Sequence, residues 1–245
     1  MGATDKQRYD DRPAFLLHSY AFRETSLVAE VFTREFGRLG LVARGARRPK
    51  SNLRGVLLAF QPLRLSWSGK GELRTLVRAE WIGGLPQLQG LALMCGFYLN
   101  ELLLKLMHRD DPHEALFDRY RETLDALAGG GAPEAALRRF EKNLLKEVGY
   151  ALTLDHDADA VAPIDPAARY TYVIDRGPVL LEPNESAGNR VELSGQTLID
   201  IAADDFSATT TLAQSKLLMR ALIDHYLGNQ RLHTRKLLQD MQQLW

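Results

Sequence analysis

The sequence predicts an α+β chain: a small β-barrel followed by a mainly α-helical domain with a small β insertion. Up to residue 82, short apolar runs and apolar–polar alternation are separated by Gly-containing turns, as in β-strands. After Pro86, apolar residues recur about every 3.6 positions, as in helices. Charge changes at the same place: residues 1–82 carry 15 Lys and Arg against 8 Asp and Glu, and residues 83–245 carry 16 against 23. These observations predict domains at 1–82 and 83–245.

Five strands are expected in the first domain, at residues 14–19, 26–33, 39–43, 63–67 and 73–81. Turn residues separate them, including Gly37 and the Gly69–Lys70–Gly71 segment. Five short strands in about eighty residues predict a small barrel such as the OB-fold, which binds oligonucleotides across a strand face and its loops. The strand pattern fits an SH3-like barrel equally well.

The most basic segment lies between residues 34 and 55, where seven cations face a single acid, Glu35. Glycines and one proline break the segment into turns, so we expect an exposed loop. Guanidinium groups bind phosphate through charge-assisted hydrogen bonds, which favours contact with a nucleic-acid backbone over a loop that only aids solubility. The predicted DNA-binding residues are Arg34, Arg38, Arg44, Arg47, Arg48, Lys50 and Arg54, with Lys70 and Arg74 as secondary candidates.

Trp67 allows two interpretations. An exposed tryptophan in a barrel of this kind can stack on a nucleic-acid base. The alternation of Trp67 with Leu63 and Leu65 instead favours packing in the core.

The second domain is expected to be helical, with a β-hairpin near 169–182. The predicted helices span residues 91–107, 112–127, 133–149, 194–203, 212–227 and 234–244, with Ser194 as an N-cap. The third helix carries a row of cations opposite its apolar face. They are Arg138, Arg139, Lys142 and Lys146. The row predicts a dock for an acidic partner, and a solvated helix face is the alternative.

Signals for catalysis, metals and cofactors are weak. No nucleophile, phosphate-loop or zinc motif occurs, and the single cysteine, Cys95, lies in the most apolar helix. His156, Asp157, Asp159 and Asp165 follow no ligand spacing, so we expect no metal site, no cofactor and no enzyme activity. The polar N-terminus and the absence of a long apolar segment predict a cytoplasmic protein with no membrane partner.

Four blocks of the sequence resemble the RecO family of bacterial recombination mediators: FLLHSYAFRETSLVAEVFT, GRLGLVARGARRPKS, ALRRFEKNLLKEVGY and RLHTRKLLQDM. The resemblance implies an N-terminal OB-fold and a helical domain. It also implies binding of single- and double-stranded DNA, annealing of complementary strands, and work with RecR and single-strand-binding protein to load the RecA recombinase. Family members bind the acidic C-terminal tail of single-strand-binding protein. Some carry a four-cysteine zinc module, which this sequence lacks.

The expected function is therefore DNA binding and strand annealing in repair, on the nucleoid and without bond chemistry. An OB-fold RNA-binding factor fits the charge pattern almost as well. A metal-dependent nuclease using residues 155–165 is a weaker alternative.

Overall fold

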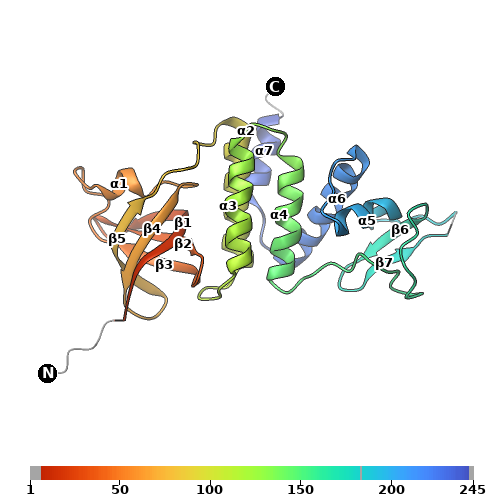
Figure 1. Cartoon of the computed structure of the whole chain (residues 1–245), viewed down its shortest axis with the longest axis horizontal. Helices are drawn as coiled ribbons and strands as arrows, with labels where there is room; N and C mark the ends of the chain where they lie inside the picture. The colour runs from red at the N-terminus through yellow and green to blue at the C-terminus, as the bar shows by residue number, and fades with distance from the viewer. Residues whose placement is uncertain (1–6, 183, 243–245) are drawn as a thin grey trace. The chain divides into compact units, whose positions relative to one another are not determined.

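A computed structural model describes residues 7–182 and 184–242, with side chains up to residue 237 (Figure 1). The chain forms two compact units, one made of Met1–Gly131 and Leu232–Trp245, the other of Ala132–Arg231. Each is considered by itself below. The division of the sequence after residue 82 stays a prediction, because these units describe packing rather than sequence domains.

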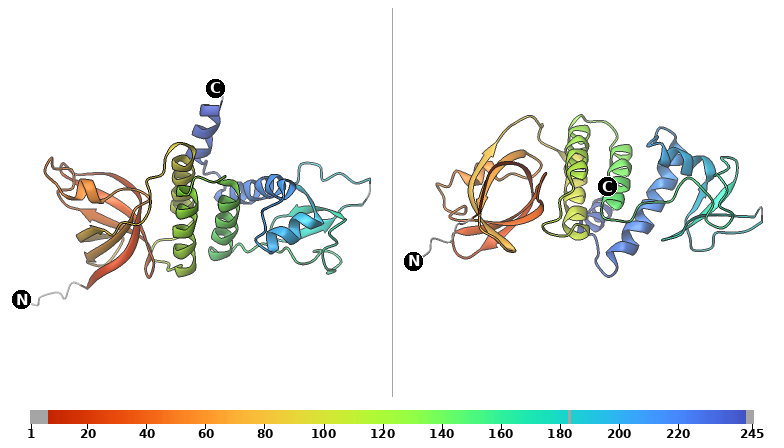
Figure 2. Two further views of the ribbon diagram at one scale, coloured as in Figure 1. Left: turned by 45° about the horizontal axis from the view of Figure 1, so that its top comes forward. Right: turned by 60° about the horizontal axis from the view of Figure 1, so that its bottom comes forward.

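The first unit contains a closed five-stranded barrel. Its strands are β1 (Arg8–Phe22), β2 (Ser26–Thr33), β3 (Gly37–Ala43), β4 (Pro62–Ser68) and β5 (Leu73–Trp81). They are hydrogen-bonded in the order β1-β2-β3-β5-β4, and β4 returns to β1 (Figure 2, right). β3 and β5 pair in parallel and all other neighbours are antiparallel. This is the OB-fold arrangement, so the predicted barrel is confirmed and the SH3-like alternative is not.

The first strand is longer than predicted. It begins at Arg8 rather than Ala14, because the polar residues before Pro13 pair with β4. The sequence does not reveal this polar part of the strand, because a strand whose side chains are mostly exposed shows no apolar–polar alternation.

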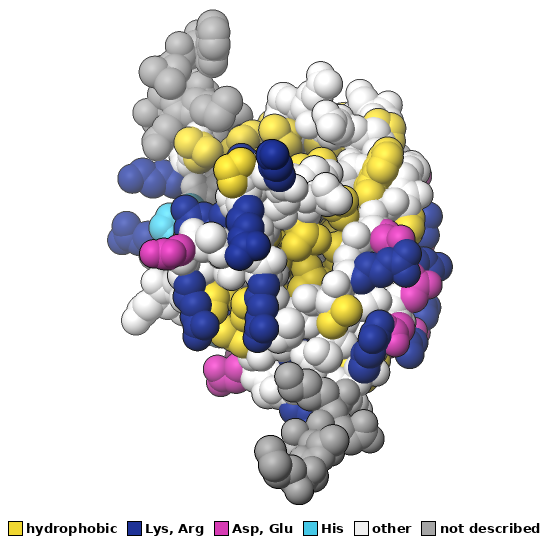
Figure 3. All heavy atoms as spheres, turned by 90° about the vertical axis from the view of Figure 1, so that its left-hand side faces the viewer, with side chains coloured by type: hydrophobic (Ala, Val, Ile, Leu, Met, Phe, Trp, Pro, Cys, Tyr) yellow, Lys and Arg dark blue, Asp and Glu magenta, His cyan; other side chains and the backbone are white. Residues whose placement is uncertain are grey.

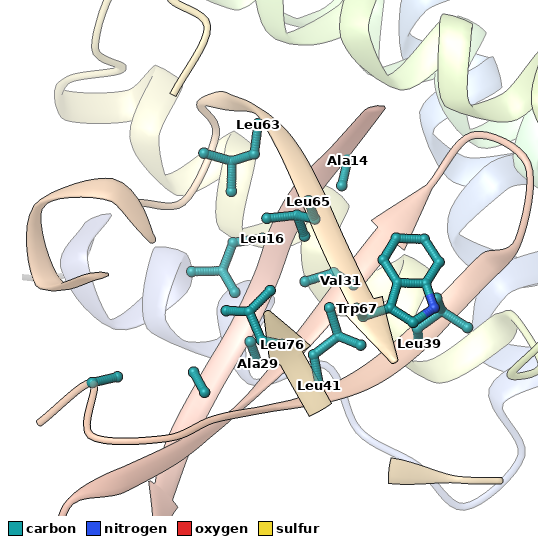
Figure 4. Close-up of a cluster of buried hydrophobic side chains, with 12 residues drawn as sticks. Ala14, Leu16, Ala29, Val31, Leu39, Leu41, Leu63, Leu65, Trp67 and Leu76 are labelled. Carbon is teal, nitrogen blue, oxygen red and sulfur yellow. The ribbon is translucent and has the colours of Figure 1, made fainter. Parts of the chain in front are cut away.

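All five strands contribute side chains to one barrel core (Figure 4). Trp67 lies within it and is 0% exposed. Its ring stacks on Tyr9 at 5.3 Å between centroids and meets the edge of Phe36 at 5.4 Å. Core packing of Trp67, favoured by the alternation, is therefore confirmed.

Strand register places the loops at two ends of the barrel. One end, here the α1 end, holds the β1–β2 turn at 23–25, the β3–β4 connection at 44–61 and the last residues of β5. The connection includes the short helix α1 (Leu53–Val56). The other end, here the hairpin end, holds the β2–β3 turn at 34–36 and the β4–β5 turn at 69–72. A ligand bound by the loops at one end contacts the loops at the other end only if it is long enough to span the barrel.

Two helices, α2 (Gly90–Leu106) and α3 (Glu114–Ala128), pack with the barrel. Phe117 and Tyr120 of α3 lie against Phe15 of β1, at 5.3 and 5.1 Å between ring centroids. The buried Asn100 of α2 donates a 2.8 Å hydrogen bond to the carbonyl of Leu17 and accepts one from the Tyr120 hydroxyl. Tyr98, Leu102 and Leu103 of the apolar face predicted for α2 are buried, whereas Leu91 and Phe97 are exposed at 54% and 41%. No described helix is both long and apolar enough to cross a membrane.

The second unit combines helices with a three-stranded sheet. Its helices are α4 (Glu134–Glu147), α5 (Gly195–Ala202) and α6 (Thr209–Leu227). The sheet has the order β7-β6-β8, from β6 (Arg169–Val173), β7 (Gly177–Leu180) and β8 (Glu192–Ser194). The predicted hairpin and the Ser194 cap, whose oxygen accepts from the Thr197 N–H, are confirmed. The three-residue strand β8 was not predicted, because so short a strand has no readable period.

The last helix, α7 (His233–Gln242), returns to the first unit and packs with α2. Its predicted end at residue 244 lies outside the described residues. Glu101 of α2 accepts hydrogen bonds from the backbone N–H groups of His233 and Thr234 at 2.8 and 2.9 Å. The carboxylate thus occupies the positive end of the helix dipole. Burial alone would raise the pKa of Glu101, but the hydrogen bonds from Thr234 and His233 outweigh it and hold that pKa below 4.5.

We predict that Glu101→Gln lowers the free energy of unfolding by about 0.5–2 kcal/mol at pH 7, because it weakens this cap. The folded-state pKa is depressed, so the stabilisation is present above pH 4.5 and is lost as the pH falls through the folded value. Urea unfolding at pH 7 and pH 4 measures both effects. The control is Glu122→Gln, an exposed carboxylate on α3 that pairs with Arg119. Equal losses at both pH values would contradict the assignment.

Candidate nucleic-acid interface

The basic loop, defined here as residues 44–54, is held firmly at the α1 end. Ala46 is 1% exposed within the barrel core, and Leu53 packs against the same core. Consecutive turns shape the loop, with hydrogen bonds from the Arg48 N–H to the Gly45 carbonyl and from the Ser51 N–H to the Arg48 carbonyl, both 3.0 Å. Gly45 has φ +67°, a conformation that favours glycine. The loop is therefore exposed, as predicted, but it is also anchored.

Every cation of the basic loop is exposed: Arg44, Arg47, Arg48, Lys50 and Arg54. Within the part of the chain that the structure describes, the side chains of Arg44, Arg48, Lys50 and Arg54 make no hydrogen bond or ion pair. Figure 3 shows Lys and Arg side chains gathered on the barrel face of the molecule. Unpaired guanidinium groups keep their donors free for phosphate oxygens, so this surface suits a polyanion.

The structure adds Arg23 to this surface. The Arg47 N–H donates to the Thr25 carbonyl at 2.9 Å, and the Arg47 side chain donates to the carbonyls of Arg23 and Glu24. The β1–β2 turn therefore lies directly beside the basic loop. Arg23 is exposed and makes no ion pair with a described residue. Sequence reasoning missed it because a single arginine in a turn carries no signal until its neighbours in space are known.

The four other predicted DNA-binding residues lie at the hairpin end. Only Lys70, in the β4–β5 turn, is exposed there. Arg34 pairs with Glu114 and Asp118 of α3, at 2.5 and 2.9 Å. Its hydrogen bond to Asp118 raises the pKa of Arg34 and lowers that of Asp118. Arg74 pairs with Asp110 in the α2–α3 connection.

Arg38 belongs to a buried ion cluster. The carboxylate of Glu30, 5% exposed, lies between Arg109 and Arg38, whose nitrogen is 3.6 Å away. Burial lowers the pKa of the Arg38 guanidinium, while Glu30 opposes that shift. Gly37 allows the connection to approach, because a side-chain carbon there would stand 1.9 Å from the Asp111 carbonyl oxygen.

These contacts show what Arg34, Arg38 and Arg74 do in the folded chain. Arg34 and Arg74 join the barrel to α3 and to the α2–α3 connection. The Arg38 side chain pairs with Glu30 within the barrel, and it is the Arg38 carbonyl that accepts from the Asp110 N–H, at 3.0 Å. Removing one partner of a buried ion pair leaves an uncompensated charge and costs about 3–5 kcal/mol when burial is complete. A role for these three arginines in DNA binding stays a prediction, and their guanidinium groups are already engaged.

The cations of α4 do not form the exposed row that their spacing predicted. Arg138 is 8% exposed and pairs with the buried Glu141 at 2.6 Å. Lys142 donates to the carbonyls of Ile201 and Ala202 at the end of α5, at 2.6 and 3.1 Å. A cation at this position complements the negative end of the α5 dipole.

The remaining members of the row differ in exposure. Arg139 donates to the Asp204 carbonyl at 3.1 Å and lies over the Phe206 ring. Lys146 is exposed. The alternative of a solvated helix face therefore fits Lys146 but not Arg138, Arg139 or Lys142, because helical spacing cannot show which side meets α5. Binding of an acidic partner by these residues stays a prediction.

In the Asp-rich connector, residues 153–168, two of the aspartates make structural contacts. Asp157 is buried and accepts hydrogen bonds from the N–H groups of Asp159, Ala160 and Leu180, at 2.8, 2.6 and 2.7 Å. Asp159 pairs with Arg176. Among the side chains that the structure describes, in residues 7–182 and 184–237, no group of three His, Cys, Asp or Glu is placed to hold a metal ion.

Comparison with known proteins identifies the family of this chain. Residues 10–85 match the family model described as Recombination protein O N terminal, and residues 87–236 match Recombination protein O C terminal. The DNA repair protein RecO of Nitrosospira multiformis is 57% identical over 240 residues, covering 98% of this chain and 99% of the relative. The protein of the same name from Aromatoleum aromaticum is 55% identical over 241 residues, covering 98% and 100%. The chain belongs to the RecO family of DNA repair proteins.

Proposed function

We propose that this chain is a recombination mediator in DNA repair that binds single- and double-stranded DNA through the basic loop and anneals complementary strands. It acts with RecR and single-strand-binding protein to load the recombinase, on the nucleoid in the cytoplasm. The family supports the repair role. The observation that carries the DNA-binding surface is the set of anchored, exposed and unpaired cations at the α1 end of the barrel.

The proposed mechanism is electrostatic. Each cation that neutralises a phosphate releases condensed counterions, which drives binding regardless of sequence. Two strands bound to the same surface repel each other less, so complementary bases can meet. No covalent bond is made or broken, and the chain acts without nucleotide or metal.

We predict that Arg44→Ala with Arg48→Ala weakens binding to single-stranded DNA of any sequence and makes the dependence on salt shallower. Each lost phosphate contact removes about 0.7 from the slope of log K against log salt, so two contacts remove about 1.4. A fluorescence-anisotropy titration at several salt concentrations measures both quantities.

The matched control is Arg8→Ala with Arg64→Ala, which removes the same charge from arginines already paired with Asp10 and Asp11. Its slope should stay close to that of the wild type. An unchanged slope in the basic-loop variant would remove this loop from the interface. Tighter binding to RNA than to DNA of the same sequence would favour an RNA-binding factor.

Annealing gives a second prediction. Complementary oligonucleotides should anneal at the same accelerated rate in chelator without ATP, because phosphate neutralisation needs neither metal nor nucleotide. Fluorescence energy transfer between labelled strands reports the rate, and the basic-loop variant should lose most of the acceleration. Acceleration that requires added Mg²⁺ or Zn²⁺, or strand cleavage with Mg²⁺, would contradict the mechanism.

The acidic tail of single-strand-binding protein is the proposed ligand of α4. Of the four cations predicted there, Lys146 is the exposed one, so a free carboxylate reaches it without displacing an intramolecular contact. We predict that Lys146→Ala weakens binding of a fluorescent tail peptide by about 1.5–3 kcal/mol, the range for hydrogen bonds to charged groups. Lys216→Ala, an exposed lysine on α6, is the control. Equal peptide affinity in all three proteins would exclude α4 as the docking site.

A further inference from the structure

Trp81, the last residue of β5, is 59% exposed. Large aromatic side chains are mostly buried, as Trp67 on the neighbouring strand is at 0%. Ile82, the next residue, and Val77, four residues earlier on β5, are also exposed, at 52% and 48%. The barrel thus presents an aromatic ring on a strand end that its own fold does not cover.

The ring of Trp81 is held in place. Its indole N–H donates a 3.0 Å hydrogen bond to the side-chain oxygen of Gln61, which is 5% exposed. The backbone is held too, because the Ile82 N–H donates to the Pro62 carbonyl at 3.2 Å. Gly83 and Gly84, both with positive φ, follow directly in the chain. An exposed ring that is already oriented loses little conformational entropy when a flat ligand stacks on it.

Strand pairing places Trp81 at the same end as the basic loop. β5 runs parallel to β3, with Val42 opposite Thr75. The chain leaves β3 after Ala43 to form the basic loop, while β5 continues in that direction to Trp81. Five residues of strand beyond Leu76 span about 17 Å. Helix α1, which carries Arg54, packs beside β5.

An exposed aromatic ring beside unpaired cations is the combination that binds single-stranded nucleic acid. The cations follow the phosphates, and the ring stacks on a base regardless of its identity. Figure 3 shows apolar side chains exposed among the Lys and Arg side chains of this face. This charge complementarity favours a nucleic-acid strand over a protein partner.

We propose that Trp81 is a base-stacking platform for single-stranded DNA whose phosphates occupy the basic loop. The inference rests on the proposed function and adds a contact to it. Stacking needs an unpaired base, because the faces of bases in a duplex are already covered by their neighbours. Trp81 therefore contributes to binding of single strands and leaves binding of intact duplex to the cations.

The test uses the full chain and four proteins: wild type, Trp81→Ala, Trp81→Phe and Ile82→Ala. The probes are oligothymidine, an abasic strand with the same number of phosphates, and a duplex. Trp81→Ala should weaken oligothymidine binding about 5- to 150-fold, the equivalent of 1–3 kcal/mol per stacked base. Its salt slope should match that of the wild type, since no phosphate contact is lost. Trp81→Phe should retain most of the affinity.

The controls separate stacking from misfolding and from charge. Ile82→Ala removes a neighbouring exposed side chain without a ring and should bind as the wild type does. Wild type and Trp81→Ala should bind the abasic strand and the duplex equally. Comparison of unfolding midpoints identifies any variant that loses affinity through instability, and Trp81→Phe then decides the result.

Other outcomes would overturn the proposal. Equal oligothymidine affinity in wild type and Trp81→Ala would remove the stacking contact, and a lost self-association in that variant would assign the surface to a second copy of the chain. In both cases the wild type still binds DNA, so the proposed function survives. A wild type that binds neither DNA probe at low salt would overturn the function and the stacking together.

Discussion

The parallel pairing of β3 with β5 is the constraint on which the arrangement of this surface depends. Antiparallel neighbours could continue as an open meander, whereas this pairing closes the sheet and removes its edges. It also requires the chain to leave β3 and travel back before β5 can run in the same direction. The β3–β4 connection that begins this return contains the basic loop. The parallel pairing of β3 with β5 thus accounts both for the closed barrel and for the exposed position of the basic loop.

Arginines that look alike in the sequence have different partners in the fold. Arg38 lies in a buried cluster with Glu30 and Arg109, whereas Arg48 points its charge to solvent. The difference follows from the end of the barrel at which each residue lies. Arg38 lies at the hairpin end, where the α2–α3 connection pairs with it through a β-bridge to Arg109, whereas Arg48 lies in the basic loop at the α1 end and meets solvent. Density of charge in the sequence therefore marks a candidate segment, but the contacts at each end decide which of its cations stay exposed.

Much of this fold could be read from the sequence because it depends on local periodicity. Alternation identified β4 and β5, and the alternation of Trp67 with Leu63 and Leu65 assigned the indole to the core. The missed parts depend on contacts between distant segments. The α4 cations contact α5 about sixty residues later, and Arg23 becomes part of the surface only through Arg47. Trp81 continues the apolar alternation of β5, yet it is exposed, because β5 extends beyond the residues that pair with β3.

A chain with no net charge can bind a polyanion because charge acts locally. At physiological ionic strength the Debye length is about 8 Å, so acids elsewhere in the chain do not cancel the field at the loop. Asp10, Asp11 and Glu80 each pair with an arginine on a strand. At the α1 end the exposed cations of the basic loop and Arg23 outnumber the exposed acid of the β1–β2 turn, Glu24, so the surface there is positive on balance. In the proposed annealing mechanism, such a surface binds phosphates regardless of base sequence, tightly at low salt and weakly at high salt. Bound strands could then exchange and find their complements without a conformational change of the chain.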